Sequence, residues 1–193
     1  NKDVKYRGNI GYIPGELGMD KDLSGIEICK YVAKLQGQQI DTQKVEEIAK
    51  RLKLDLSKPI QELSKGNRQK VGIVTALMKE NDLYILHEPT SGLDPIIKNE
   101  FYSLLIEKQQ KTGCSILLCS HILSEVEKYC DRVAIIRLGK IVEVSNITKL
   151  KEMSLKRFEL EFQTSVGANN IQTYLEEEYP KVEIVRKRNG MLE

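Results

Sequence analysis

The sequence predicts an α/β fold, because short apolar segments alternate with longer segments of helical periodicity. Two of the apolar segments, Leu83–Leu86 and Ser115–Cys119, are too short to cross a membrane and suit buried strands. Two more, residues 132–136 and 140–144, are joined by Leu138-Gly139, which is typical of a hairpin turn. With 193 residues, the chain is long enough for a substantial domain with a buried core.

The helical segments occupy most of the first half of the chain. Residues 8–14 predict a short strand that enters a loop, and helical spacing follows from residue 23 to residue 78. Asp94-Pro95 can cap and begin a further helix, which Gly113 ends. Apolar residues at helical spacing form three stripes: Ile26, Cys29, Val32 and Ala33; Val45, Ile48, Ala49 and Leu52; and Ile97, Phe101, Leu104 and Leu105.

The last third of the chain predicts smaller elements. A short helix is expected over residues 124–130, before the hairpin. Beyond Asn146, residues 158–162 alternate as a half-exposed strand and residues 182–185 are a candidate partner for it. A helix is expected near residues 171–179. We interpret residues 146–193 as a small α/β extension of unassigned role.

Composition narrows the function classes. The net charge of +2 is too small to indicate binding to nucleic acid or to an anionic membrane surface. The four cysteines have no CxxC pair or zinc spacing, and two lie in apolar helix or strand contexts, which predicts reduced, buried thiols as in cytosolic proteins. No segment approaches the ~18 apolar residues of a membrane span, and no signal peptide is apparent.

A carboxylate stands directly after the strand that ends near Leu86. The segment His87-Glu88-Pro89-Thr90-Ser91-Gly92-Leu93-Asp94-Pro95 continues from it. The strand delivers Glu88 to its C-terminal end, where open α/β sheets bind ligands. A carboxylate held there can polarise a water molecule, although a lone acidic residue after a strand is more often a helix cap or a surface charge.

Two other segments carry similar signals. In Leu63–Lys70, Ser64 can cap the following helix, Gly66 permits a close approach of backbone to a ligand, and the helix N-terminus attracts phosphate. Taken alone, this segment is an ordinary Ser-capped helix. The strand Ser115–Cys119 ends at Ser120-His121, and a single histidine in that place is usually structural.

Taken together and in this order, the three segments resemble ABC ATPases. Leu63–Lys70 resembles the signature motif of that family, with Lys65 and Asn67 where Gly and Gln are commoner. The segment from Leu86 to Pro95 resembles its Walker B and D-loop segment, and His121 resembles its switch histidine. The resemblance implies a partial P-loop NTPase (RecA-like) core. In this interpretation the helical subdomain covers about residues 17–80, the core 81–145 and the extension 146–193.

The resemblance also implies a mechanism. In the family, two ATP-binding domains close head to tail around two ATP molecules with Mg²⁺ and drive a membrane permease. Glu88 would be the general base or water-positioning carboxylate, and His121 would contact the γ-phosphate. Ser64, Lys65, Gly66 and Asn67 would meet the nucleotide of the second subunit, and Ser91, Gly92 and Asp94 would lie in the loop that crosses the interface.

Two short segments near the start of the chain indicate the kind of transporter. Tyr12-Ile13-Pro14-Gly15-Glu16 followed by Asp22-Leu23-Ser24-Gly25 is similar to ABC-2-type exporter subunits. The expected protein is therefore an exporter ATPase, cytoplasmic and peripheral on the inner face of the cell membrane.

Three features depart from the family pattern. No G-x-x-x-x-G-K-[ST] occurs in the 193 residues, so the expectation is a sequence truncated before the P-loop and inactive by itself. His87 stands where the family carries the Asp that holds Mg²⁺, a cation that prefers oxygen ligands. Gly15-Glu16 stands where a metal-reaching Gln is usual, and Glu16 could substitute for it. His87 and Glu16 are therefore the candidate metal ligands.

Two other functions compete with this interpretation. The chain could be a nucleotide-incompetent fragment or paralogue that acts as a binding or regulatory partner, which His87 and the missing P-loop pattern favour. The same fold also serves DNA repair, chromosome structure and the ribosome. Those relatives carry long coiled coils or a second cassette, and this sequence shows neither; its small net charge also argues against nucleic acid.

Overall fold

The computed structural model describes residues 8–149, 160–161, 174, 187–188 and 191–192. The chain divides into two compact units, residues 1–131 and 132–193, and each is described by itself. The predicted boundary between a family core and an extension at residue 145 remains a prediction.

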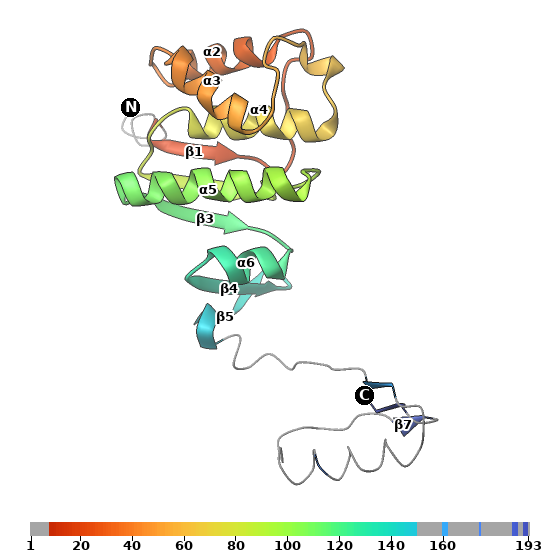
Figure 1. Ribbon diagram of the computed structural model, residues 1–193. Helices are drawn as coiled ribbons and strands as arrows, with labels where there is room; N and C mark the ends of the chain where they lie inside the picture. The colour runs from red at the N-terminus through yellow and green to blue at the C-terminus, as the bar shows by residue number, and fades with distance from the viewer. Residues whose placement is uncertain (1–7, 150–159, 162–173, 175–186, 189–190, 193) are drawn as a thin grey trace. The chain divides into compact units, whose positions relative to one another are not determined.

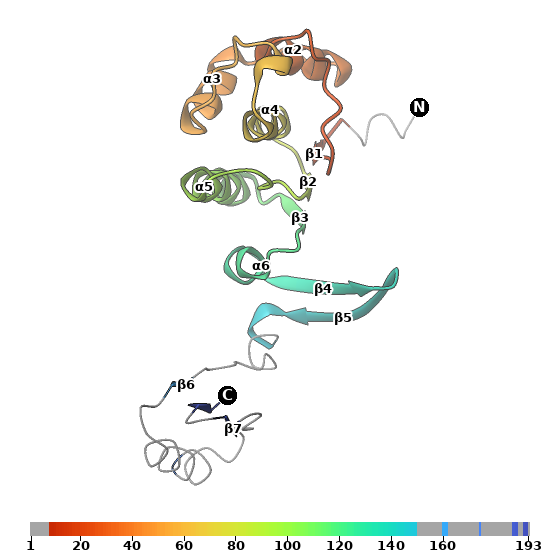
Figure 2. The ribbon, with the colours of Figure 1, turned by 90° about the vertical axis from the view of Figure 1, so that its right-hand side faces the viewer.

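The first unit is built on a parallel sheet of three strands, two of which are labelled in Figure 1 and all three in Figure 2. These strands are β1 (Ile10–Ile13), β2 (Leu83–His87) and β3 (Ser115–Cys119), in the spatial order β1-β2-β3. Leu86 is aligned with Ile13 on one side and with Leu118 on the other, and His87 is aligned with Cys119. Because the strands are parallel, their carboxyl ends meet at one edge, as the sequence predicts for Glu88 and His121.

Four helical segments connect β1 to β2. They are α2 (Gly25–Leu35), α3 (Thr42–Arg51), the short 3₁₀ helix η1 (Ile60–Glu62) and α4 (Lys65–Leu77). Side chains at the helix starts explain where each α-helix begins. The Ser24 N–H and hydroxyl both donate to Glu27 Oε2 (2.8 and 2.6 Å), and Asp41 accepts the N–H of Lys44 (3.1 Å). The helical spacing of residues 23–78 is thus confirmed.

Two further helices follow β2. Helix α5 (Pro95–Thr112) begins at Asp94, whose carboxylate accepts the N–H groups of Ile96 and Ile97 at 3.0 Å each. It ends at Gly113, whose φ of 69° is the left-handed conformation that terminates helices. Helix α6 (Leu123–Tyr129) follows β3. Both predicted helices are confirmed, with α6 beginning one residue earlier than expected.

The helices α4 and α5 pack on one face of the sheet (Figure 2). Side chains that point to this face, such as Ile13, Tyr84 and Leu86, are at most 1% exposed. Side chains on the other face alternate with them along each strand, and there Tyr12 is 58% and Leu117 54% exposed. His87 shares the parity of Leu83 and Ile85, so its side chain lies on this second face. No helix in the described part of the chain is both long enough and apolar enough to span a bilayer.

The four cysteines are all free. The sequence predicts burial for the cysteines in apolar helix and strand contexts; this is confirmed for Cys29 in α2 and wrong for Cys119, which is exposed at the end of β3. Cys114, just before β3, is also buried. Burial raises the pKa of the Cys29 thiol to about 12, so this thiol stays protonated.

The second unit contains the predicted hairpin. Strand β4 (Arg132–Arg137) pairs antiparallel with β5 (Lys140–Asn146) across Leu138 and Gly139, whose φ values of 50° and 72° suit a type I′ turn. Among the few residues described beyond 149, three short strands follow: β6 (Leu160–Glu161), β7 (Lys187–Arg188) and β8 (Met191–Leu192), in the order β6-β8-β7.

Of the C-terminal predictions, the strand at 158–162 appears as β6, which pairs with β8 among the described residues. The predicted strand at 182–185 lies outside the described residues. So does the predicted helix at 171–179, apart from Tyr174, which is helical.

Candidate functional site

Glu88 and His121 meet at the carboxyl edge of the parallel sheet. Glu88 follows β2 directly, and His121 follows β3 after one residue. Glu88 Oε1 lies 2.8 Å from His121 Nδ1 and also accepts the backbone N–H of His121 at 3.1 Å. The Glu88 N–H in turn donates to the Cys119 carbonyl oxygen at 2.8 Å. The two residues, 33 positions apart, therefore form one unit at the sheet edge, with the Glu88 carboxylate mostly covered and the imidazole exposed.

The backbone of Glu88 is strained. Its φ of 47° is left-handed, a conformation that costs a non-glycine residue about 1–3 kcal/mol and persists where neighbours enforce it. Ser91 helps to enforce it, because its N–H donates to the Glu88 carbonyl oxygen at 3.2 Å. The buried Gln69 of α4 also contributes, because its amide donates to the Pro89 carbonyl oxygen at 2.9 Å.

The start of α4 touches the loop that follows Glu88. Ser64 caps the helix, since its hydroxyl oxygen accepts the N–H of Asn67 at 3.2 Å. A Cβ atom on Gly66 would lie 2.6 Å from the Gly92 carbonyl oxygen, so only glycine permits this backbone contact. Gly92 itself has a φ of 74°, which glycine adopts without strain. The structure thus brings the signature-like segment against the loop of Ser91, Gly92 and Asp94.

The chain is similar in sequence to known proteins. A family model described as ABC transporter matches residues 1–91. An uncharacterized ABC transporter ATP-binding protein of Methanocaldococcus jannaschii is 36% identical over 153 residues, which cover 75% of this chain and 56% of that protein. The bacitracin transport ATP-binding protein BcrA of Enterococcus faecalis is 34% identical over 154 residues, covering 79% of this chain and 50% of BcrA.

Solved structures agree with the sequence relatives. One titled as the structure of an ATP-binding subunit of an ABC transporter is 30% identical, has a TM-score of 0.68 and covers 78% of this chain and 64% of that chain. The chain belongs to the ABC ATPase family. Its α/β architecture is the P-loop NTPase fold of that family, as predicted. A dimeric ATP-binding cassette bound to ADP and Pi is 18% identical with a TM-score of 0.68 and supports the fold alone. This ABC ATPase chain spans roughly half the length of the curated relatives it matches.

Asp94 and Glu16 have different surroundings in this ABC ATPase chain. Hydrogen bonds from the backbone N–H groups of Ile97 and Ile96 hold the pKa of Asp94 below its usual range, despite the opposing effect of burial. Its place in the structure is therefore that of a helix cap. Glu16 and Lys65 are exposed, and neither side chain makes a hydrogen bond with any residue that the structure describes.

The residues present do not fit the Mg²⁺ that the ABC family implies. The last residue of β2 is His87, whose side chain is an imidazole, whereas Mg²⁺ demands oxygen ligands. Glu88 Oε1 is already engaged by His121. The described residues contain no group of three or more His, Cys, Asp or Glu side chains that could hold a metal ion.

Glu125, a buried carboxylate to which the sequence assigned no role, connects the segments that carry the ABC motifs by hydrogen bonds. Glu125 of α6 accepts hydrogen bonds from Thr90 Oγ1 (2.8 Å), Lys98 Nζ (3.0 Å) and Tyr102 OH (2.7 Å). It thereby links the helix after His121 to the loop after Glu88 and to α5. Burial opposes its charge, but the hydrogen bonds from Tyr102, Lys98 and Thr90 outweigh it and lower the pKa of Glu125.

Gln69 lies within the signature-like segment Leu63–Lys70 but received no role from the sequence, and Glu125 belongs to no motif. The only local signal is a polar residue on the apolar side of a helix, and that signal does not identify a partner. Their importance appears only when the segments around residues 69, 90 and 125 are placed together.

We expect Glu125→Ala to lower the free energy of unfolding by about 2–3 kcal/mol, because it leaves Lys98, Thr90 and Tyr102 without their shared acceptor. Denaturant titration measures this, with Glu127→Ala on the same helix as control. The excess stability from the Glu125 charge is present above the carboxyl pKa of the unfolded chain. It is lost as pH falls through the lowered folded pKa, so Glu125→Gln should lack this acid-dependent loss. Equal losses in the two alanine variants would contradict the assignment.

Proposed function

We propose that this chain is part of the ATP-binding and ATP-hydrolysing subunit of an ABC transporter that drives export through a membrane permease. The observation that carries the proposal is the contact between Glu88 and His121 at the carboxyl edge of the sheet. Phosphoryl transfer needs positioning and electrostatic stabilisation rather than covalent chemistry, and this pair can supply both. An intact pair also favours a working ATPase over a nucleotide-incompetent regulatory partner.

Each member of the pair has a separate role in the proposal. Glu88 orients the attacking water and accepts its proton, as a positioned carboxylate can. His121 turns Nδ1 toward Glu88, which leaves Nε2 for an oxygen of the γ-phosphate. The imidazole is 80% exposed, so a nucleotide could reach it. A divalent cation would accompany ATP in this proposal, and His87 stands where the family carries the carboxylate that holds that cation.

A second copy of the subunit completes the site in this proposal. The first N–H groups of α4, at Lys65 and Gly66, attract phosphate, because a helix N-terminus carries partial positive charge. The solved cassette bound to ADP and Pi, which shares the fold of this chain, is itself titled as a dimer. Ser91, Gly92 and Asp94 then belong to the loop that crosses between the two copies.

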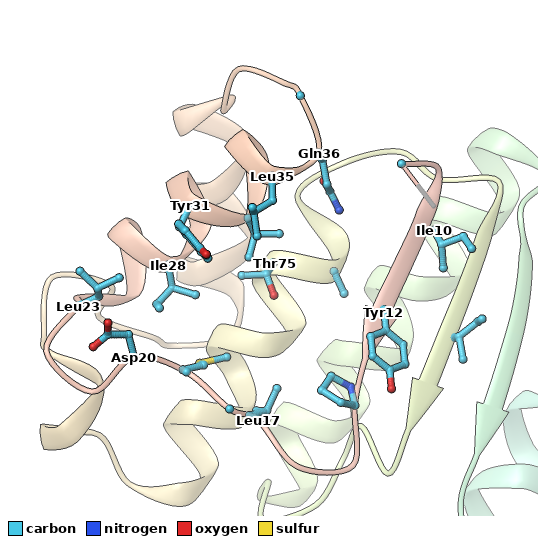
Figure 3. A pocket seen from close by; sticks show the side chains of 18 residues that line it. Ile10, Tyr12, Leu17, Asp20, Leu23, Ile28, Tyr31, Leu35, Gln36 and Thr75 are labelled. Atoms are coloured by element: carbon cyan, nitrogen blue, oxygen red, sulfur yellow. The ribbon is translucent and has the colours of Figure 1, made fainter. Parts of the chain in front are cut away.

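The permease would dock on a groove between the helical segments and the sheet. The groove has a volume of about 1290 Å³ and is mostly apolar. Figure 3 shows Leu23, Tyr31 and Leu35 on its helical side and Ile10 and Tyr12 on β1. Tyr31 and Leu35 are 55% and 68% exposed, which suits contact with a partner helix. In this proposal the subunit lies on the cytoplasmic face of the membrane, as the resemblance to ABC-2-type exporter subunits implies.

The proposal is tested with the complete protein and its His121→Ala variant. We expect the variant to bind ATP but to release phosphate about 10²–10³-fold more slowly, because a group that stabilises the transferring phosphoryl is removed. Calorimetry measures binding and a phosphate assay measures turnover, with Tyr129→Phe on α6 as the control for a nearby aromatic change. Unchanged turnover in His121→Ala would refute the proposed site.

A further inference from the structure

The side chain of His87 lies against the backbone of Gly15. The two residues end neighbouring parallel strands, since Ile13 of β1 is aligned with Leu86 of β2. A Cβ atom on Gly15 would lie 2.3 Å from His87 Nδ1 and 2.7 Å from Cε1. No real Cβ atom tolerates such distances, so any other residue at position 15 would displace the imidazole.

The backbone of Gly15 does not itself require glycine. Among the glycines that the structure describes, positive φ values occur at Gly37, Gly92, Gly113 and Gly139, and Gly15 is not one of them. The steric need for glycine at position 15 therefore comes from the His87 ring, whose atoms are the nearest to a Cβ there. Gly18, three residues later in the same loop, has no atom within 4 Å of its Cβ position.

The His87 ring is available to a ligand. The side chain is exposed and makes no hydrogen bond with any residue that the structure describes. It stands next to Glu88, whose Oε1 is held by His121. Imidazole nitrogen suits first-row transition cations, whereas Mg²⁺ requires oxygen. A single protein ligand is enough when phosphate oxygens and water complete the coordination.

We propose that Gly15 and His87 are a complementary pair, in which glycine makes room for an imidazole that binds the divalent cation of the nucleotide through nitrogen. The site then selects a transition cation such as Co²⁺ over Mg²⁺. This inference rests on the proposed function, because the nucleotide supplies the remaining ligands.

Pulsed EPR tests the nitrogen ligand directly. The complete protein is loaded with Mn²⁺ and a non-hydrolysable ATP analogue, with ordinary histidine or with ¹⁵N-histidine. We expect a nitrogen coupling that changes with the isotope, which excludes the adenine ring as its source. It should persist in Gly18→Ala, disappear in His87→Asp and disappear or weaken in Gly15→Ala. Bound Mn²⁺ without histidine coupling in the wild type would overturn the proposal.

Cation preference provides a second readout. The nucleotide analogue is titrated calorimetrically in the presence of Co²⁺ or Mg²⁺. We expect His87→Asp to shift the ratio of the two affinities about tenfold or more toward Mg²⁺. Gly15→Ala should shift the affinity ratio in the same direction. Adding Gly15→Ala to His87→Asp should have no further effect, because the imidazole that the alanine would displace is already absent.

The outcomes separate this inference from the proposed function. An unchanged ratio in His87→Asp, with nucleotide still bound, overturns the cation assignment and leaves the ATPase assignment standing. Absence of nucleotide binding with every cation tested overturns both.

Discussion

Glu88→Gln in the complete protein is expected to lower ATP turnover by about 10²–10⁴-fold while ATP binding is retained. The amide oxygen can still accept the backbone N–H of His121, which Glu88 Oε1 now accepts at 3.1 Å. The loop geometry is therefore preserved, whereas the negative charge that orients and deprotonates water is lost. Phosphate release under saturating ATP measures the change.

The matched control is Glu46→Gln, which changes an exposed carboxylate of α3 in the same way. It should leave turnover unchanged. Thermal melts of both variants check that neither loses the fold. Turnover in Glu88→Gln within a few-fold of the wild type would remove Glu88 from the chemistry, even if the contact with His121 is real.

Substitutions at Ser64 are expected to separate helix capping from phosphate binding. The hydroxyl of Ser64 caps α4 through the N–H of Asn67, and losing a cap costs about 1 kcal/mol. Ser64→Asp keeps a good cap but places a negative charge where the phosphate of the second subunit would lie. We therefore expect Ser64→Asp to retain the melting temperature and to abolish ATP-dependent dimers.

Ser64→Arg and Ser64→Ala complete this series. The bulky arginine should block closure of the dimer while ATP binding by each monomer stays intact. Alanine should lower stability by the cost of the cap and affect dimers only through that loss. Sizing chromatography with and without ATP measures dimers. If Ser64→Asp dimerises with ATP as the wild type does, the start of α4 is only a capped helix.

Much of the fold could be predicted from the sequence because its signals are local. Asp94 and Pro95 mark the start of α5 and Gly113 marks its end, and the structure places all three there. The positions of Glu88 and His121 at the sheet edge could also be predicted, because each follows a strand of clear apolar pattern, but their roles in the proposed site came from the resemblance to ABC ATPases. The strand with which β6 pairs could not be predicted, because strand pairing depends on contacts between residues distant in sequence.

The sequence by itself determined the order of strands and helices, the caps that bound them, and the family to which the chain belongs. These follow from periodicity, capping residues and short motifs, each of which acts over a few neighbouring residues. The tertiary structure alone decided which side chains meet. It joins Glu88 to His121, centres Glu125 among Thr90, Lys98 and Tyr102, and sets His87 against Gly15. The physical reason is that parallel strands bring distant segments to one edge, and no local pattern encodes the distances that result.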